Sequence, residues 1–150
     1  MFKTLTMKKN ESSFQFIEHI ITKSIFINKE INKNKKDFNL NLNPSGILHI
    51  KSKQFQLALD LEVLDAEEKS LLNVQIIGFF KYEGELDEIK HFLYLNAPAL
   101  IYPYLRAYVS TLTTLSGLGT YTLPTMNLIS LKDKIEENIE IIDDIKHNFI

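Results

Sequence analysis

The chain contains no cysteine and no tryptophan, and among its 150 residues there are only five glycines, four prolines and four histidines. Without cysteine it has no disulfide, no thiolate zinc site and no cysteine nucleophile. This usage fits a reducing compartment. The N-terminal residues show no signal-peptide pattern, so we expect a cytoplasmic protein. No run of about 20 apolar residues occurs, and we therefore expect no membrane-embedded segment.

The sequence also lacks an excess of positive charge. Its 17 Lys and Arg residues are balanced by 19 Asp and Glu residues, which gives a formal net charge of −2. Nucleic-acid binding requires a concentrated basic face that neutralises phosphates. The lysine-rich residues 29–36 are more typical of a solvated loop, so we expect no nucleic-acid partner.

Catalytic and cofactor motifs are absent as well. The four histidines, His19, His49, His91 and His147, lie on different expected elements. No zinc, calcium, phosphate-loop, dinucleotide or nucleophile-elbow pattern occurs. The sequence therefore predicts no catalytic residue, no metal site and no cofactor, and we expect that the protein is not an enzyme.

The first half of the chain shows the alternation of strands. In residues 54–65, five apolar side chains share one face: Phe55, Leu57, Leu59, Leu61 and Val63. Further strands are expected over 14–27, 38–50 with a break at 43–46, and 71–82, where Gly78 indicates a bulge or a close backbone approach. Strand 14–27 is apolar on both faces: Ile20 shares a face with Phe14, and Ile21 lies on the other face. A helix layer or another subunit must therefore cover the second face.

The second half shows helical spacing. Asn96 is the expected N-cap of a helix that ends at Gly117, and Pro103 should kink this helix or loosen its first turns. A second helix is expected from Leu131 to Phe149. The 150 residues thus predict a single α+β domain whose residues 1–12 form a flexible N-terminal segment.

Charge is missing from the middle of the second half. Arg106 is the only charged residue in 92–131, although 24% of the chain is charged. A helix this apolar must be covered on nearly all sides, which a single sheet cannot do, so we expect oligomerisation through the helix. The residues assigned to that interface are Ile101, Leu105, Tyr108 and Leu112.

The uncharged stretch continues beyond the helix as an extended, proline-containing segment, residues 118–128. It either packs along the sheet or lines an apolar groove for a partner chain. The candidate polypeptide-binding residues are Tyr104, Leu115, Leu118, Tyr121, Leu123, Met126 and Leu128.

Three stretches resemble the SecB family of protein-export chaperones. Residues 95–106, LNAPALIYPYLR, are similar to the family's central helix with its Pro-aromatic-x-Arg ending. Residues 122–128, TLPTMNL, resemble the extended segment that follows this helix, and residues 73–80 resemble the family's fourth strand. With the order of elements, the resemblance covers roughly residues 14–145.

The resemblance implies a four-stranded antiparallel sheet, a long helix packed on it and a second, C-terminal helix. It also implies a homotetramer built as a dimer of dimers. The implied function is that of an ATP-independent holdase, which binds unfolded polypeptides and preproteins for export and passes them to the translocase motor SecA.

One departure concerns SecA. The family's acidic docking positions fall at Ser24, Asn28 and Asn73, none of which is acidic here. Weak or absent SecA docking is therefore expected. Some SecB-like proteins instead hold the antitoxin of a toxin–antitoxin system, and this chaperone role is the alternative function. A purely structural oligomer and a small-molecule enzyme are the remaining hypotheses, and the scattered histidines disfavour the enzyme.

Overall fold

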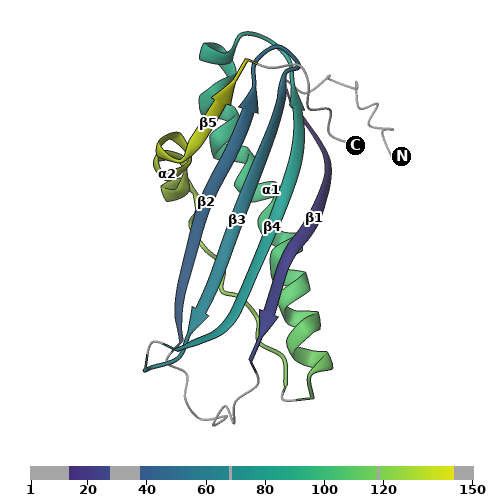
Figure 1. The fold of residues 1–150 in the computed structure, drawn as a ribbon, viewed down its shortest axis with the longest axis vertical. Helices are drawn as coiled ribbons and strands as arrows, with labels where there is room; N and C mark the ends of the chain where they lie inside the picture. Colours follow the sequence, from purple (N-terminus) through teal and green to yellow (C-terminus); the bar gives the residue numbers. More distant parts are fainter. Residues whose placement is uncertain (1–13, 28–37, 68, 118, 144–150) are drawn as a thin grey trace, which may run out of the picture.

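A computed structural model describes residues 14–27, 38–67, 69–117 and 119–143. Four strands come first, then a long helix, a short helical region and a last strand (Figure 1). Their bounds are β1 Phe14–Phe26, β2 Asn39–His49, β3 Gln54–Leu64, β4 Ser70–Tyr82, α1 Leu86–Leu115, the 3₁₀ turn η1 Leu128–Ser130, α2 Leu131–Glu137 and β5 Ile139–Ile142. The N-terminal segment 1–12 lies outside the described residues.

The sheet is five-stranded and mixed, with the order β1-β4-β3-β2-β5. Strands β1 to β4 pair antiparallel, whereas β5 runs parallel to β2. The α+β class is confirmed, but the purely antiparallel four-stranded sheet and the long second helix are wrong. Helix α2 ends after seven residues, at Glu137. The β-branched run of β5 then favours extended backbone, so residues 139–142 join the sheet instead of continuing the helix.

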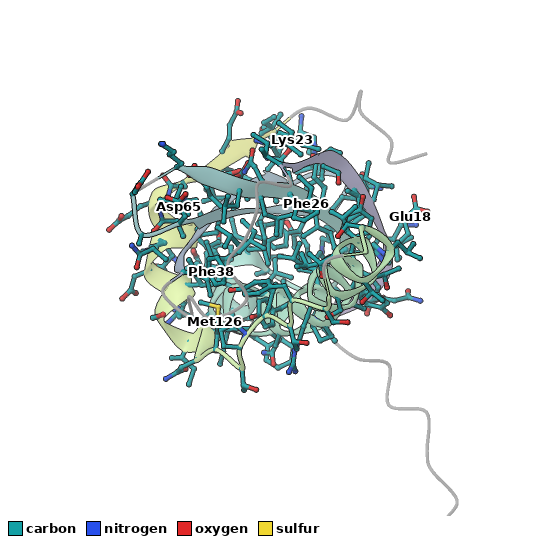
Figure 2. The ribbon with its side chains drawn as sticks, turned by 90° about the horizontal axis from the view of Figure 1, so that it is seen from below. Glu18, Lys23, Phe26, Phe38, Asp65 and Met126 are labelled. Atoms are coloured by element: carbon teal, nitrogen blue, oxygen red, sulfur yellow. The ribbon has the colours of Figure 1, made fainter. Side chains whose placement is uncertain are left out.

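Helix α1 crosses one face of this sheet (Figure 1), and the core lies between the two layers. The five predicted inward residues of β3 are all buried, with Phe55, Leu57, Leu59 and Leu61 completely inaccessible. Phe26 and Phe38 pack against this core, whereas Glu18 and Asp65 lie at the periphery (Figure 2). Burial of one face of β3 therefore follows directly from its alternation.

Strand β1 departs from the simple alternation that its sequence suggests. Its pairing with β4 shifts register between Phe16 and Glu18 and again between Ile21 and Lys23. Each bulge moves the following side chains to the other face. Ile21 consequently packs against the core that contains Phe14, whereas Ile20, which was predicted to share the face of Phe14, is exposed.

Strand β2 is continuous where an interruption was predicted. Pro44 pairs with Leu59 and Gly46 with Leu57, without any shift in register. A Cβ atom on Gly46 would lie 2.6 Å from the carbonyl oxygen of Gln56, so glycine permits the close approach of β2 to β3. The segment 43–46 is therefore part of a strand, and its glycine meets a steric requirement of the sheet.

Helix α1 begins at Leu86, ten residues before the predicted cap at Asn96. The carbonyl of Glu85 accepts from the N–H groups of Glu88 and Ile89, and acidic Asp87 and Glu88 occupy the first turn, where they complement the helix dipole. Both Pro98 and Pro103 lie within the helix. Asn96 donates its side-chain amide to the Phe92 carbonyl, so it is a helix-interior residue. The C-terminal end was predicted correctly, since Ser116 caps the helix and Gly117 follows with a φ of 87°.

Gly78 marks the place where α1 approaches β4. A Cβ atom there would lie 2.5 Å from Cγ2 of Ile101 and 3.0 Å from Cε2 of Phe80. The pairing of β4 is regular at this residue on both sides. Of the two interpretations of Gly78, close approach is therefore confirmed and the bulge is not. None of the described helices combines the length and apolarity that a membrane span requires.

Candidate functional site

The outward surface of α1 is apolar although solvent reaches it. Phe92, Leu100 and Tyr104 are 40–45% exposed, and Leu115 is 81% exposed. A helix with one face in water normally carries charged residues on that face. Between Phe92 and Leu115, Arg106 is the only charged residue. This surface therefore has the composition of one that another polypeptide covers.

An extended segment, residues 119–127, runs back along α1 towards α2. The Tyr121 N–H donates to the hydroxyl of Thr113 at 2.8 Å, and the Tyr102 hydroxyl donates to the carbonyl of Pro124 at 2.5 Å. Leu123 is 1% exposed and belongs to the core. These contacts fix the segment against one side of the helix.

A pocket of about 500 Å³ opens between α1 and this segment. We call it the segment-side pocket. Its lining residues are Tyr102, Pro103, Arg106, Ala107 and Ser110 from the helix and Thr125 and Met126 from the segment. Burial raises the pKa of the Tyr102 phenol, and the nearby guanidinium of Arg106 opposes this rise. Arg106 is half-buried and has no carboxylate partner among residues that the structure describes. The pocket is thus a mostly apolar recess with one positive charge.

The other side of α1 faces β1 and carries aromatic residues. Tyr104 stacks on His19, with ring centroids 4.3 Å apart, and lies 5.7 Å from Phe16. The Tyr108 hydroxyl donates to the hydroxyl of Ser24 at 2.8 Å. We call these residues the β1-side cluster. They lie beside β1, which is an edge strand among the described strands and pairs there with β4 alone.

The predicted polypeptide-binding residues fall into three groups. Leu123 is a core residue, because its side chain is inaccessible. Tyr121, Met126 and Leu128 are half-buried and pack against the core, and burial raises the pKa of the Tyr121 phenol. Tyr104 and Leu115 are exposed on α1. Leu118 lies outside the described residues.

The predicted interface residues divide in a similar way. Ile101 and Leu105 have no accessible surface within the chain, because they face the sheet. We therefore assign both to the core and no longer to an interface. Tyr108 and Leu112 are half-buried, so part of each side chain reaches the surface. The helical stripe could not separate these pairs, because a helix that is apolar on two faces shows no contrast between them.

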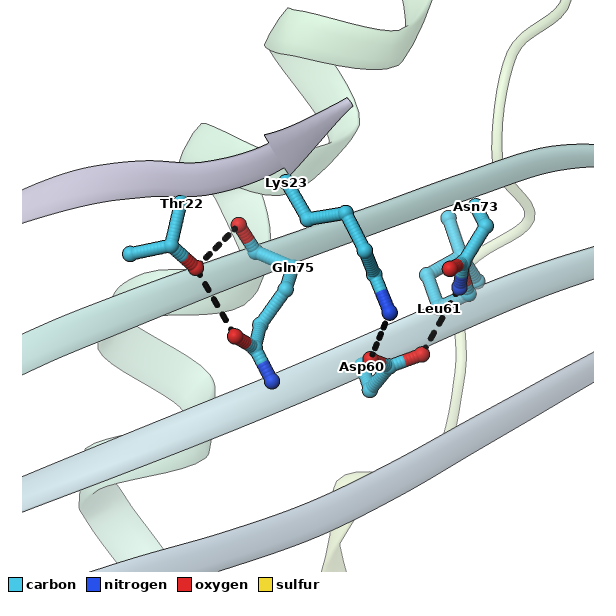
Figure 3. Close-up of polar contacts among 6 residues, drawn as sticks. All are labelled: Thr22, Lys23, Asp60, Leu61, Asn73 and Gln75. Carbon is cyan, nitrogen blue, oxygen red and sulfur yellow. Dashed lines mark hydrogen bonds and ion pairs between the residues drawn. The ribbon is translucent and has the colours of Figure 1, made fainter. Parts of the chain in front are cut away.

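The predicted SecA-docking positions do not share a face in the structure. Asn73 lies on the sheet face opposite α1, where it donates to Asp60 at 2.8 Å, and Lys23 forms an ion pair with the same carboxylate at 2.9 Å (Figure 3). Ser24 instead bonds Tyr108 of α1. Asn28 lies outside the described residues. Because both partners of the Lys23–Asp60 pair are partly exposed, this network contributes little to stability.

Of the residues that line the pocket, the sequence predicted only Met126 and missed Tyr102, Pro103, Arg106, Ala107, Ser110 and Thr125. Arg106 could have indicated this pocket in the sequence, because the one charged residue of 92–131 marks where the helix meets solvent. Within the described part of the chain, no group of three His, Asp or Glu side chains is arranged to hold a metal ion.

Known proteins provide an independent comparison. The family model for SecB, described as preprotein translocase subunit SecB, matches residues 11–136. An uncharacterized protein of Methanocaldococcus jannaschii, MJ0357, is 26% identical over 133 residues, which cover 83% of this chain and 86% of that protein. Among solved structures, the chain is similar to Rv1957 of Mycobacterium tuberculosis, a SecB-like chaperone in complex with a ChAD peptide from the antitoxin HigA1.

The likeness to Rv1957 has a TM-score of 0.64 at 15% identity and covers 77% of this chain and 91% of that chain. At this identity it bears on the fold, and it agrees with a SecB-like arrangement of sheet and long helix. The family match covers most of the chain and includes strands β1 to β4, α1 and the extended segment. The chain therefore belongs to the SecB family of chaperones.

Proposed function

We propose that this protein is an ATP-independent holdase that binds unfolded polypeptides and keeps them from aggregating. The observation that carries this proposal is the almost uncharged surface of α1 that solvent reaches, with Phe92, Leu100 and Leu115 exposed. An unfolded chain has no fixed shape, so a surface that binds it must be apolar and adaptable rather than polar and exact in geometry. No nucleotide or metal enters this function, and we propose no catalytic role.

The segment-side pocket is the proposed client site. Met126 supplies a flexible, polarizable side chain that can repack around different partners. Pro103 and Ala107 leave the helix surface open there, because neither side chain fills the recess. We propose that apolar client side chains enter this pocket beside Met126 and that the neighbouring Tyr121 and Leu128 provide further client contacts.

The β1-side cluster is the proposed oligomer interface. Tyr104, which the sequence assigned to the client surface, lies with Tyr108 beside the edge strand β1. Covering it with another copy would bury exposed aromatic area and satisfy an open strand edge. We propose a homotetramer, arranged as a dimer of dimers, that works in the cytoplasm.

A chaperone dedicated to an antitoxin is the second candidate. Rv1957, which resembles this chain in fold, was solved with a peptide of the HigA1 antitoxin. The absence of acidic side chains at Ser24 and Asn73 also argues against a SecA partner, because no charge steers a basic surface to these positions. The neighbouring gene decides between the candidates, since an antitoxin chaperone should co-purify with the product of an adjacent antitoxin gene.

A charge placed in the pocket tests the client site. Ala107 is exposed and lines the recess, so Ala107→Glu adds a carboxylate without removing any packing. The matched control is Ala66→Glu, in the exposed turn between β3 and β4. The probe is reduced, carboxymethylated α-lactalbumin, a permanently unfolded chain. Because the protein has no tryptophan, tryptophan fluorescence reports on the probe alone.

We expect Ala107→Glu to weaken binding of the probe at least ten-fold, because client apolar groups would desolvate the new carboxylate. Ala66→Glu should bind as the unmodified protein does, and both variants should keep its melting temperature and oligomeric mass. Equal binding by both variants would show that clients do not use this pocket. No binding by any form, the unmodified protein included, would refute the holdase function.

A further inference from the structure

Strand β5 is a short addition at one edge of the sheet. It consists of Ile139–Ile142 and, within the part of the chain that the structure describes, pairs with β2 alone, in parallel. The SecB family model matches residues 11–136, so this strand lies beyond the part of the chain that the family model accounts for. Strand β5 is therefore an addition to the part of the chain that the family model describes.

The attachment of β5 is weak by several criteria. Parallel pairing is less stable per residue than antiparallel pairing, and only four residue pairs form here. Ile141 is 53% exposed, and of the three isoleucines only Ile139 packs against the core. The preceding helix is anchored separately, through the buried residues Leu131 and Ile135. Release of β5 therefore does not require α2 to leave the core.

The edge that β5 occupies is the part of β2 that can accept a strand. The N–H of Gly46 donates to the carbonyl of Asn138, and the N–H of Ile50 donates to the carbonyl of Ile142. Because the ladder alternates, residue 44 also points its backbone nitrogen towards this edge, and there Pro44 has no hydrogen to donate. Pro44 thus prevents strand pairing just before Gly46. The N–H donors that follow on this edge, those of Gly46 and Ile50, are the ones that β5 covers.

We infer that the Gly46–Ile50 edge of β2 is a docking site for an extended, apolar segment of client polypeptide, and that β5 fills this site in the free protein as a built-in, displaceable substitute. Main-chain hydrogen bonds to a sheet edge ignore client sequence, while alternate positions select apolar side chains. Strand β5 has this character, with Ile139 and Ile141 on one face. This inference rests on the proposed holdase function and adds a competition between β5 and the client.

A reversible lock tests the competition. Ile47 and Glu140 are partners across the β2–β5 pair, and both line a hollow on the sheet face opposite α1. The chain has no cysteine, so the double variant Ile47→Cys with Glu140→Cys forms a single defined disulfide. The matched control is Ser45→Cys with Ala58→Cys, which joins β2 to β3 on the same face and leaves β5 free.

We expect the oxidised Ile47–Glu140 variant to bind reduced, carboxymethylated α-lactalbumin at least ten-fold more weakly than the same protein after reduction. The Ser45–Ala58 control should bind equally in both redox states. Equal binding by the oxidised and reduced Ile47–Glu140 variant would overturn the inference and leave the holdase function intact. Absence of binding by every reduced form and by the unmodified protein would refute the holdase function itself.

A second variant approaches the same question without a disulfide. By the alternation of the ladder, Glu140 points its N–H towards β2 and Ile141 points its N–H away. Glu140→Pro should therefore loosen β5 and tighten probe binding several-fold, whereas Ile141→Pro should stay closer to the unmodified protein. Weaker binding by Glu140→Pro, with an unchanged melting temperature, would contradict the inference.

Discussion

Substitution of Gly78 by alanine tests how α1 is seated on the sheet. The added methyl would lie 2.5 Å from Cγ2 of Ile101, far inside van der Waals contact, and 3.0 Å from Cε2 of Phe80. Neither neighbour moves easily, because both are fully buried and isoleucine is stiff at χ1. Overpacking of a core typically costs about 1–3 kcal/mol, whereas replacing a strand glycine by alanine recovers about 0.5–1 kcal/mol of backbone entropy. We therefore expect a net loss of about 1–2 kcal/mol.

The assay is urea unfolding followed by far-ultraviolet circular dichroism at one fixed protein concentration, because an oligomer's stability depends on concentration. A double-mutant cycle with Ile101→Ala isolates the contact. That single change should cost about 2–5 kcal/mol, and the double variant should cost less than the two losses combined by about 1–2 kcal/mol, because the new methyl enters the vacated space. An unchanged midpoint for Gly78→Ala, or strictly additive losses, would refute this account of the helix–sheet contact.

Three further predictions concern the surface and the core. Tyr104→Asp should reduce the oligomer mass measured by native mass spectrometry and leave the protomer folded. The reason is that the ring is 45% exposed in the single chain but buried in the proposed oligomer. A mass equal to that of the unmodified protein would argue against this interface. Burial raises the pKa of Tyr94 to about 12, with a smaller contribution from Glu136. Between pH 10 and about 12 the unfolded chain loses this proton while the folded chain keeps it, so urea midpoints should fall as pH rises, and less steeply in Tyr94→Phe; equal slopes would contradict the burial argument. Surface plasmon resonance should detect no salt-sensitive binding of SecA, and a tight complex abolished by Asn73→Lys would overturn this expectation.

The sheet was predictable where a single face is buried. Every second residue of β3 from Phe55 to Val63 is apolar and buried, so these inward residues could be named from the sequence. Strand β1 could not be assigned in this way, because it is apolar on both faces and its two bulges leave no mark in the residue pattern. Its contacts with β4, and not its own alternation, determine that Ile21 faces the core.

The helices show a related limit. The start of α1 was missed because Asn96 and Pro98 together imitate an N-terminus, whereas Gly84 and the acidic pair Asp87 and Glu88 mark the true one. In residues 131–142, isoleucines at 135 and 139 fit a helix, and isoleucines at 139 and 141 fit a strand. Residues 139–142 form a strand because they can pair with the edge of β2. This pairing depends on the tertiary structure and cannot be seen in the local sequence.

The candidate site was predictable in outline only. The missing charge of residues 92–131 located the apolar surface, and the order of the elements indicated that an extended segment follows α1. Which side chains reach that surface depends on how the helix is turned on the sheet. Ile101 and Leu105 face the sheet, whereas Ala107 and Met126 line the pocket, and no periodicity separates these residues beforehand.

The most direct test of the holdase function measures the aggregation of a denatured client by light scattering, with the protein present and nucleotide absent. We predict that aggregation is suppressed as the protein approaches equimolar amounts, and that adding ATP changes nothing, because the proposed binding surface is a preformed apolar one. Aggregation at an unchanged rate in the presence of excess protein, or suppression that requires ATP, would contradict the account.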